Sequence, residues 1–341
     1  MAEKLLDIDG LKVSFRTEDG VVRAVDGISI GVTKGEVLGI VGESGSGKSV
    51  TMMSVMRLII DPNVRFEGKV LYKGRDLMEL SQDDMREVRG KEIAMIFQDP
   101  MTSLNPVYTV GDQIIEAITT HEPIGNKDAK RRAIELLRQV GIPNAQSRVD
   151  DYPHQFSGGM RQRAMIAMAL SCNPDILIAD EPTTALDVTI QAQILELLDR
   201  LRADFDSAVI LITHDLGVVA EVANEILVMY AGRIVERGSK RNVFYDAQHP
   251  YTWGLLGSIP RLDRPKPTRL HSIEGTPPSL INLPQGCKFR PRCPHAFEQC
   301  WEEPPLENRV EDPGHRDRCW LAVEVKRDIR EATISGETQA A

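Results

Sequence analysis

The chain contains the sequence Gly42-Glu43-Ser44-Gly45-Ser46-Gly47-Lys48-Ser49, which fits the spacing G-x-x-x-x-G-K-[ST] of a phosphate-binding loop. A mostly apolar segment, 36–41, precedes the loop and predicts a strand, and the apolar segment 50–60 after it predicts a buried helix. Glycines let the backbone wrap around phosphates, since they adopt positive φ without a Cβ clash. The loop amides and the helix dipole then point toward negative charge. We therefore expect an α/β core in which Lys48 reaches the β- and γ-phosphates and Ser49 ligates Mg²⁺.

The composition is that of an ordinary globular protein, and the length allows two domains. The chain has 341 residues, of which 42% are hydrophobic, and a formal net charge of −9. This acidic balance argues weakly against a nucleic-acid-binding protein, which usually has a basic excess. The N-terminus lacks the apolar core of a signal peptide, and no apolar run approaches the ~20 residues of a transmembrane helix. We expect a cytosolic chain, or one that sits on a membrane through a partner.

Hydrophobic periodicity predicts further elements on both sides of the loop. Alternating patterns predict strands at 5–15 and 21–32, and shorter strands are expected at 68–72 and 92–97. After these strands the hydrophobic pattern changes, and apolar residues recur at helical spacing in 110–120 and 127–140. We interpret residues 99–169 as a helical insertion in the α/β core.

Carboxylates follow another apolar strand of this core, at Asp180 and Glu181. A nucleotide site with Mg²⁺ needs one carboxylate for the metal shell and can use a second to polarise water. The pattern gains weight because Asp180 lies 138 residues after Gly42 (180 minus 42). A second apolar strand, 208–213, ends at His214, where ligands of α/β sheets collect, so a functional histidine is favoured over a structural one.

These motifs occur in one order: the loop, Gln98, Ser157-Gly158-Gly159, Asp180-Glu181, Ala185-Leu186-Asp187 and Thr213-His214-Asp215. Over residues 1 to about 240 this order resembles the nucleotide-binding subunit of ATP-binding-cassette (ABC) transporters. The resemblance implies a P-loop nucleotide triphosphatase fold with a helical subdomain. One departure is that Phe156 and Met160 flank Ser-Gly-Gly, where the commonest family form has Leu and Gln.

The resemblance also implies roles for single residues. Phe15 falls at the position of an aromatic residue that stacks on adenine, although core packing explains an aromatic there equally well. Phosphates are expected at Gly42, Ser44, Gly45, Gly47, Lys48 and Ser49. Mg²⁺ is expected at Ser49, Gln98 and Asp180. Glu181 would be the general base, Gln98 would contact the attacking water, and His214 would contact the γ-phosphate. Ser157 and Gly159 would bind the γ-phosphate of ATP held by a partner subunit.

The C-terminal sequence narrows the resemblance to one branch of the family. His249-Pro-Tyr-Thr252, Pro284-Gln-Gly-Cys287 and Pro291-Arg-Cys293 resemble the tail of the ATPases of oligopeptide, dipeptide and nickel importers. This implies an ABC ATPase domain at 1–245, an importer-type extension at 246–330 and a flexible tail at 331–341. It also implies peripheral attachment to the cytoplasmic face of the inner membrane, under two permeases fed by an extracytoplasmic binding protein. A second, related ATPase subunit is expected, and nucleic acid is not.

Peptide import is the leading functional hypothesis, and three alternatives stay open. The cargo of such an importer could be nickel or another small solute. The chain could also be a soluble cassette protein of DNA repair or translation, although it has one cassette and no long heptad run. An exporter cassette is the third alternative, which the importer-like tail disfavours.

Four of the five cysteines, Cys287, Cys293, Cys300 and Cys319, lie in the last 55 residues. In a reducing cytosol, such a group indicates a metal more often than disulfides. The spacing matches neither the C-x₂-C-x₂-C-x₃-C run of bacterial ferredoxins nor the paired C-x₂-C of a zinc ribbon. The resemblance favours a [4Fe–4S] cluster with all four thiolates as ligands. Structural zinc and four unligated thiols are the alternatives.

Overall fold

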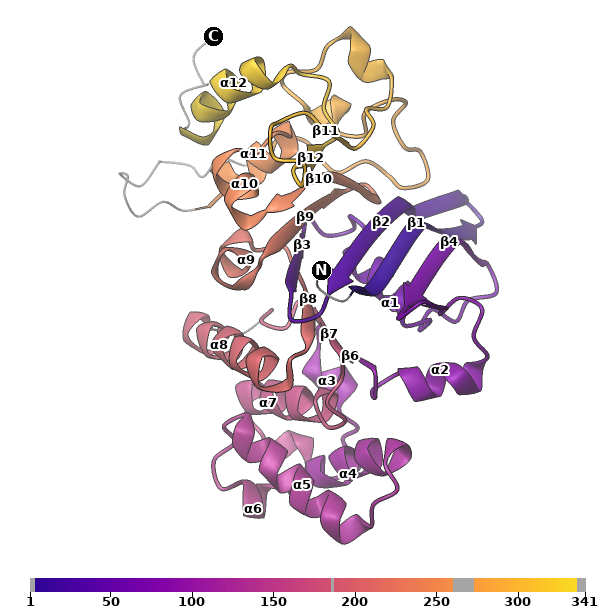
Figure 1. Ribbon diagram of the computed structural model, residues 1–341, viewed down its shortest axis with the longest axis vertical. Coiled ribbons are helices and arrows are strands. Elements are labelled where there is room, and N and C mark those ends of the chain that lie inside the picture. The colour runs from indigo at the N-terminus through magenta and orange to yellow at the C-terminus, as the bar shows by residue number, and fades with distance from the viewer. Residues whose placement is uncertain (1–3, 185–186, 260–272, 336–341) are drawn as a thin grey trace. The chain divides into compact units, whose positions relative to one another are not determined.

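A computed structural model of the chain describes residues 4–184, 187–259 and 273–335 (Figure 1). The chain forms two compact units, each assembled from three separate stretches of sequence. The first unit consists of Met1–Asp7, Gly31–Val37 and Leu71–Ile212. The second unit consists of Ile8–Ile30, Leu38–Val70 and Thr213–Ala341.

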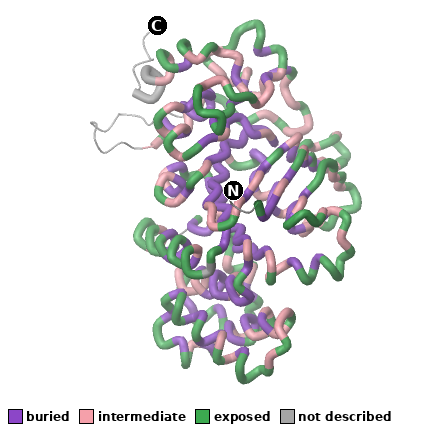
Figure 2. The backbone as a smooth tube through the Cα atoms, viewed as in Figure 1, coloured by how far each residue is buried: buried purple, intermediate pink, exposed green. Residues whose placement is uncertain are grey.

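The first unit contains three neighbouring parallel strands in the order β8-β7-β6. They are β6 (Ile93–Ile96), β7 (Ile176–Asp180) and β8 (Ala208–Thr213). Ile176 of β7 pairs with Ile93 on one side and with Ala208 on the other. Every residue of the three strands is buried (Figure 2), which explains their nearly continuous apolar sequences.

The expected helical insertion is present in the first unit. Its helices are α3 (Pro100–Ser103), α4 (Val110–His121), α5 (Asn126–Gln139), α6 (Ala145–Arg148), η1 (Pro153–Gln155) and α7 (Gly158–Ala169). Helix α7 packs against α3, α4, α5 and strand β6. The buried face of α5 includes Ala133, Ile134 and Leu137, which recur at helical spacing as the sequence pattern predicts. The insertion is thus joined to the sheet through α7.

The remaining elements of the first unit begin at clear capping residues. Ser81 caps α2 (Gln82–Val88), because its hydroxyl accepts a hydrogen bond from the Asp84 amide. Asp187 caps α8 (Val188–Phe205) in the same way. The short strand β5 (Arg75–Asp76) pairs with the last two residues of β4. Ala185 and Leu186 of the Ala-Leu-Asp motif lie outside the described residues.

The second unit contains strands in the order β11-β12-β10-β9-β3. They are β3 (Val37–Val41), β9 (Glu225–Tyr230), β10 (Arg233–Ser239), β11 (Glu307–Asn308) and β12 (Arg316–Asp317). β3 runs parallel to β9, whereas the other neighbours are antiparallel. The unit also holds most of β1 (Lys4–Thr17), β2 (Gly20–Thr33) and β4 (Val64–Tyr72), in the order β2-β1-β4. The C-terminal extension therefore adds two strands to the sheet that contains β3.

Helices of the second unit follow its strands. They are α1 (Lys48–Val55), α9 (Leu216–Val222), α10 (Lys240–Tyr245), α11 (Pro250–Gly257), η2 (Arg290–Arg292), η3 (Glu298–Trp301) and α12 (Val323–Ser335). Helices α11 and α12 pack against each other. Residues 331–335 of the expected flexible tail form the end of α12, and 336–341 lie outside the described residues.

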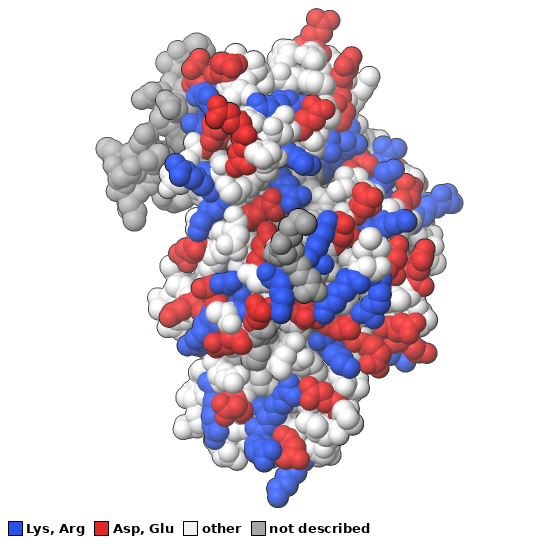
Figure 3. All heavy atoms as spheres, viewed as in Figure 1, with Lys and Arg blue, Asp and Glu red and all other residues white. Residues whose placement is uncertain are grey.

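The surface carries charges of both signs, interspersed over the face shown in Figure 3. Pairs such as Lys130 with Asp150, at 2.6 Å, and Arg131 with Asp128, at 3.1 Å, are largely exposed and contribute little stability. Within the described ranges, no helix is both long and apolar enough to cross a membrane.

Candidate functional site

The phosphate-binding loop connects β3 to α1 in the second unit. The backbone φ is +153° at Gly42, +77° at Gly45 and +97° at Gly47. A Cβ atom at residue 42 would lie 2.2 Å from the Met229 carbonyl oxygen. One at residue 47 would lie 2.3 Å from the Ala24 carbonyl oxygen. Both distances are far below van der Waals contact, so this loop path requires glycine at both positions.

Two buried side chains of the loop carry groups that suit a phosphate. Lys48 is only 4% exposed, and its Nζ donates to the carbonyl oxygens of Gly42, at 2.7 Å, and Glu43, at 3.0 Å. The hydroxyl of Ser46 is buried and has no hydrogen-bond partner among the described residues. An unsatisfied buried hydroxyl is costly, and a phosphate oxygen would satisfy it. The loop therefore fits a nucleotide phosphate chain.

Ser46 is a binding candidate that the sequence motif does not single out. The motif accepts any residue at this position, and only the burial of the hydroxyl reveals it. Ser44 and Gly45, which were predicted to bind phosphate, form the exposed tip of the loop. Ser49, predicted to ligate Mg²⁺, is half-buried in the first turn of α1.

The first unit brings together Gln98 and Glu181. Gln98 Nε2 donates to Glu181 Oε2 at 3.1 Å, and Thr184 Oγ1 donates to the same oxygen at 2.9 Å. Asp180, the last residue of β7, is buried, whereas Glu181 is half-exposed. The backbone of Glu181 has φ of +47°, a strained value for a residue with a side chain. This carboxylate is thus fixed at the carboxyl end of a buried strand, with two hydrogen bonds to one oxygen.

Ser157 and Gly159 begin helix α7. The Ser157 hydroxyl accepts from the Met160 amide at 3.3 Å and caps the helix, and Ser157 is exposed. Gly159 is half-buried in the first turn. Phe156, where the sequence departs from the commonest family form, is buried instead of facing solvent. The 12-residue helix therefore presents its positive end and the Ser157 side chain at the surface.

The other two predicted nucleotide contacts belong to the second unit. Phe15 lies on β1 and is half-exposed, so part of its ring is available for stacking. His214 directly follows β8 and is exposed. The roles of both residues stay predictions.

The expected [4Fe–4S] cluster at Cys287, Cys293, Cys300 and Cys319 is contradicted, and that prediction is wrong. No group of three or more His, Cys, Asp or Glu in the described ranges is arranged to hold a metal ion. The four thiols do line one cavity, but its volume is about 20 Å³. Such a volume admits a single water molecule, not a cluster of irons and sulfides. Because the described residues contain no group arranged to hold a metal ion, structural zinc is not supported either.

Burial changes the acidity of three of these thiols, Cys287, Cys293 and Cys319. It raises the pKa of Cys287 to about 11 and the pKa values of Cys293 and Cys319 to about 12. The thiols of Cys287, Cys293 and Cys319 are therefore protonated at neutral pH in this structure. The sequence spacing correctly indicated that the four cysteines are neighbours, but it gives no information on the volume between their thiols.

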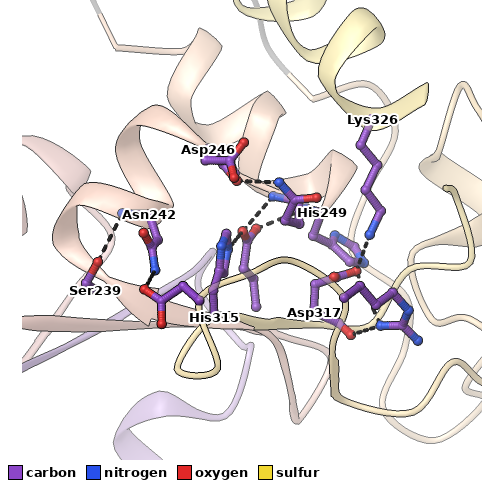
Figure 4. A network of polar contacts seen from close by, with 12 residues as sticks. Ser239, Asn242, Asp246, His249, His315, Asp317 and Lys326 are labelled. Carbon is purple, nitrogen blue, oxygen red and sulfur yellow. Dashed lines mark hydrogen bonds and ion pairs between the residues drawn. The ribbon is translucent and has the colours of Figure 1, made fainter. Parts of the chain in front are cut away.

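A buried polar network organises the start of α11 (Figure 4). The Glu236 carboxylate is fully buried and accepts from the amides of Gln248, at 2.6 Å, and His249, at 3.0 Å. His315 Nε2 lies 2.8 Å from the same carboxylate. His249 Nδ1 in turn accepts from the Tyr251 amide at 3.1 Å and caps the helix. The orientation of α11 therefore depends on a neutral His249 ring.

We expect the stability of the chain to fall below pH 6.5 because of His249. Burial, aided by the positive charge of Lys326, lowers the pKa of His249 to about 3. In the unfolded chain the ring takes up a proton below about pH 6.5, so protonation then favours unfolding. The stability contributed by the neutral His249 ring is fully present above pH 6.5 and is lost as the pH falls toward 3. The part of the free energy of unfolding that depends on His249, measured by urea unfolding as the difference from a variant that does not titrate at this position, should fall by about 1 kcal/mol between pH 6.5 and 5.5.

The matched control for this pH effect is His249→Asn. The Asn side-chain oxygen can accept from the Tyr251 amide, but it does not titrate in this range. The free energy of unfolding of this variant should depend less on pH between 6.5 and 5.5. Equal pH dependence in both proteins would contradict the assignment to His249.

Comparison with known proteins yields two family matches. Residues 25–184 match the model described as "ABC transporter". Residues 235–300 match the model described as "Oligopeptide/dipeptide transporter, C-terminal region". The two matches fall on the stretch that contains the phosphate-binding loop and on the extension that contains α11 and η2.

Similar proteins and solved structures support the same family. The chain is 54% identical to the oligopeptide transport ATP-binding protein OppD of Bacillus subtilis over 319 residues, or 93% of this chain and 89% of that protein. It is 54% identical to the dipeptide transport ATP-binding protein DppD of Escherichia coli, over 92% of this chain and 96% of that protein. A solved dimer of an ATP-binding cassette, in a post-hydrolysis state with ADP and phosphate, is 26% identical with a TM-score of 0.63. That match covers 70% of this chain and 99% of the solved one.

Proposed function

Because this chain belongs to the ABC transporter family, as an ABC ATPase with the oligopeptide/dipeptide transporter C-terminal region, we propose that it powers the import of di- or oligopeptides. The observation that carries the peptide assignment is the match of residues 235–300. The cassette alone would fit any ABC transporter, whereas this extension belongs to one branch. The names of the relatives, at 54% identity over most of both chains, support the same substrate class.

ATP would be held by the loop and its neighbours in the second unit. The loop amides, Lys48 and the unsatisfied Ser46 hydroxyl suit the phosphates, and Phe15 would stack on adenine. Ser49, Gln98 and Asp180 would hold Mg²⁺. When bound, Mg²⁺ neutralises negative charge on the phosphates.

Hydrolysis would depend on Glu181 as general base. Gln98 and Thr184 donate to Glu181 Oε2 and orient the carboxylate, which would accept a proton from the attacking water. His214 would contact the γ-phosphate. Catalysis of this kind consists mainly of positioning and electrostatic stabilisation.

A second subunit would complete the site through Ser157 and Gly159. The exposed N-terminus of α7 offers amides and a hydroxyl to the γ-phosphate of ATP bound by the partner. The similar cassette whose dimeric structure is bound to ADP and phosphate supports the pairing of two cassettes. We propose that the partner is a related ATPase rather than a second copy.

For transport, we propose that the chain attaches to the cytoplasmic face of the inner membrane, under two integral-membrane permeases. An extracytoplasmic binding protein would serve these permeases. Exposed large apolar side chains are concentrated at the start of the helical insertion, at Phe97, Met101, Val107 and Tyr108. Exposed apolar side chains gathered in one segment are typical of an interaction site. We propose that this segment contacts a permease.

The substrate assignment is tested by uptake into proteoliposomes. They would contain the full chain together with the permeases, ATPase and binding protein encoded beside it. We expect ATP-dependent accumulation of a labelled tripeptide, and no competition from Ni²⁺. Val107→Asp should reduce uptake but leave ATP binding unchanged, with Val325→Asp as the matched surface control. Uptake of Ni²⁺ without peptide uptake would contradict the proposal.

A further inference from the structure

We infer that the C-terminal extension positions the phosphate-binding loop by holding Glu43 at two points, with Tyr251 and Arg292 as the positioning residues. The inference rests on the proposed ATP site and adds a dependence of nucleotide affinity on the extension. All three residues belong to the second unit. Glu43 itself lies between Gly42 and Ser44, inside the loop.

The first point of attachment is the backbone of Glu43. Its amide donates to the phenol oxygen of Tyr251 at 2.8 Å. Tyr251 is fully buried on α11, and burial raises the pKa of its phenol far above the usual value. The phenol therefore stays neutral. One loop amide is thus directed toward the extension, which fixes the path of the backbone at residue 43.

The second point of attachment is the carboxylate of Glu43. Arg292 contacts both carboxylate oxygens, at 2.6 Å and 3.1 Å, in a bidentate pair. The guanidinium is 4% exposed and the carboxylate side chain 29%. Arg292 also donates to the carbonyl oxygens of Ile273, at 3.2 Å, and Glu274, at 2.9 Å. These additional bonds hold the guanidinium in place independently of the loop.

Aromatic packing connects the two attachment points. The rings of Tyr230, Tyr251 and Phe289 lie with their centroids 4.7 to 5.4 Å apart. Phe289 directly precedes η2, which carries Arg292. Tyr251 is oriented by His249 at the start of α11. Tyr251 and Arg292 are therefore parts of one packed cluster and not two independent contacts.

The contact between Arg292 and Glu43 affects ATP binding because Glu43 carries a negative charge. A free carboxylate in a phosphate-binding loop would repel the phosphates, and Arg292 compensates that charge. The carbonyl oxygen of Glu43 also accepts from Lys48 Nζ, so a displaced residue 43 would disturb the lysine as well. The extension thus prepares the loop for an anion in two ways: it sets the backbone and it neutralises the carboxylate.

The test compares ATP affinities of the purified full chain by binding of a fluorescent ATP analogue. Arg292→Ala should raise the Kd about tenfold, since hydrogen bonds to a charged group have this magnitude. The double variant Arg292→Ala/Glu43→Ala should bind within roughly threefold of wild type, because the uncompensated carboxylate is then absent. Tyr251→Phe should raise the Kd by a smaller factor, because it removes only the acceptor for the amide.

Arg290→Ala is the matched control. Arg290 lies in the same short helix, but its guanidinium packs over the Trp301 ring at 3.2 Å from the centroid. The Kd of the Arg290→Ala variant for the ATP analogue should equal that of wild type. If Arg292→Ala merely disrupted the extension, the double variant would bind no better than the single one, which would overturn the inference. An unchanged Kd in both Arg292→Ala and Tyr251→Phe would overturn it too. Failure of the wild-type chain to bind ATP would instead defeat the proposed function.

Discussion

Glu181→Gln should lower the rate of ATP hydrolysis by roughly 10² to 10⁴-fold, the usual contribution of a general base. ATP binding should persist, because the Gln side chain occupies the same volume and does not alter the phosphate-binding loop. Phosphate release in a single turnover would measure the rate. Size-exclusion chromatography of the variant mixed with its partner ATPase should show an ATP-loaded dimer that no longer dissociates.

Thr184→Val provides the control for this experiment. It removes one hydrogen bond to Glu181 Oε2 but leaves the carboxylate and the bond from Gln98. Its hydrolysis rate should fall far less than that of Glu181→Gln. Turnover at the wild-type rate in Glu181→Gln would exclude Glu181 as the base.

Lys48→Ala should abolish most ATP binding by the chain, whereas Ser157→Arg should leave it intact. Lys48 would contact phosphates directly, and losing such a charged contact raises the Kd roughly 10- to 100-fold. Ser157 would serve ATP bound by the partner, so a bulky cation there should block only dimer closure. Binding titrations on the isolated chain, and size-exclusion chromatography of the chain with its partner ATPase and ATP, would separate the two effects.

Loss of the helix cap is a second consequence of Ser157→Arg that needs its own control. Thr109→Ala removes the equivalent cap of α4 in the same insertion. It should cost a similar amount of stability, about 1 kcal/mol, without blocking the dimer. If isolated Ser157→Arg lost ATP binding as severely as Lys48→Ala, the shared-site arrangement would be refuted.

The sequence predicted the elements of the fold well, because local patterns determine most of them. The expected strand 208–213 coincides with β8. The expected helix 110–120 ends one residue before α4 does, and the expected helix 127–140 begins and ends one residue after α5 does. The helix after the loop was expected to reach residue 60, but α1 ends at Val55. Arg57 adopts φ of +48° shortly afterwards. The sequence stays apolar beyond the end of α1, and an apolar composition does not indicate where the backbone changes direction.

The functional predictions had a different limit, since they depend on distances between residues far apart in the chain. Gln98 and Glu181 are hydrogen-bonded across 83 residues, as a pattern shared with a family can anticipate. The cysteines were judged from their number and spacing, which do not report the small cavity between the thiols. The contact of Arg292 with Glu43 joins residues 249 positions apart and has no local signal in either segment.

That separation of 249 residues also affects how the protein is made. Residue 43 leaves the ribosome long before residue 292 is synthesised. At typical elongation rates of about 5–20 residues per second, the delay is roughly 12–50 seconds. The nascent loop lacks both of its attachments until Tyr251 is synthesised, and it lacks the attachment to Arg292 for the whole delay. Contacts between residues so far apart in the chain form late in folding. A growing chain would therefore acquire its full affinity for nucleotide only near the end of translation, when the subunit is almost complete.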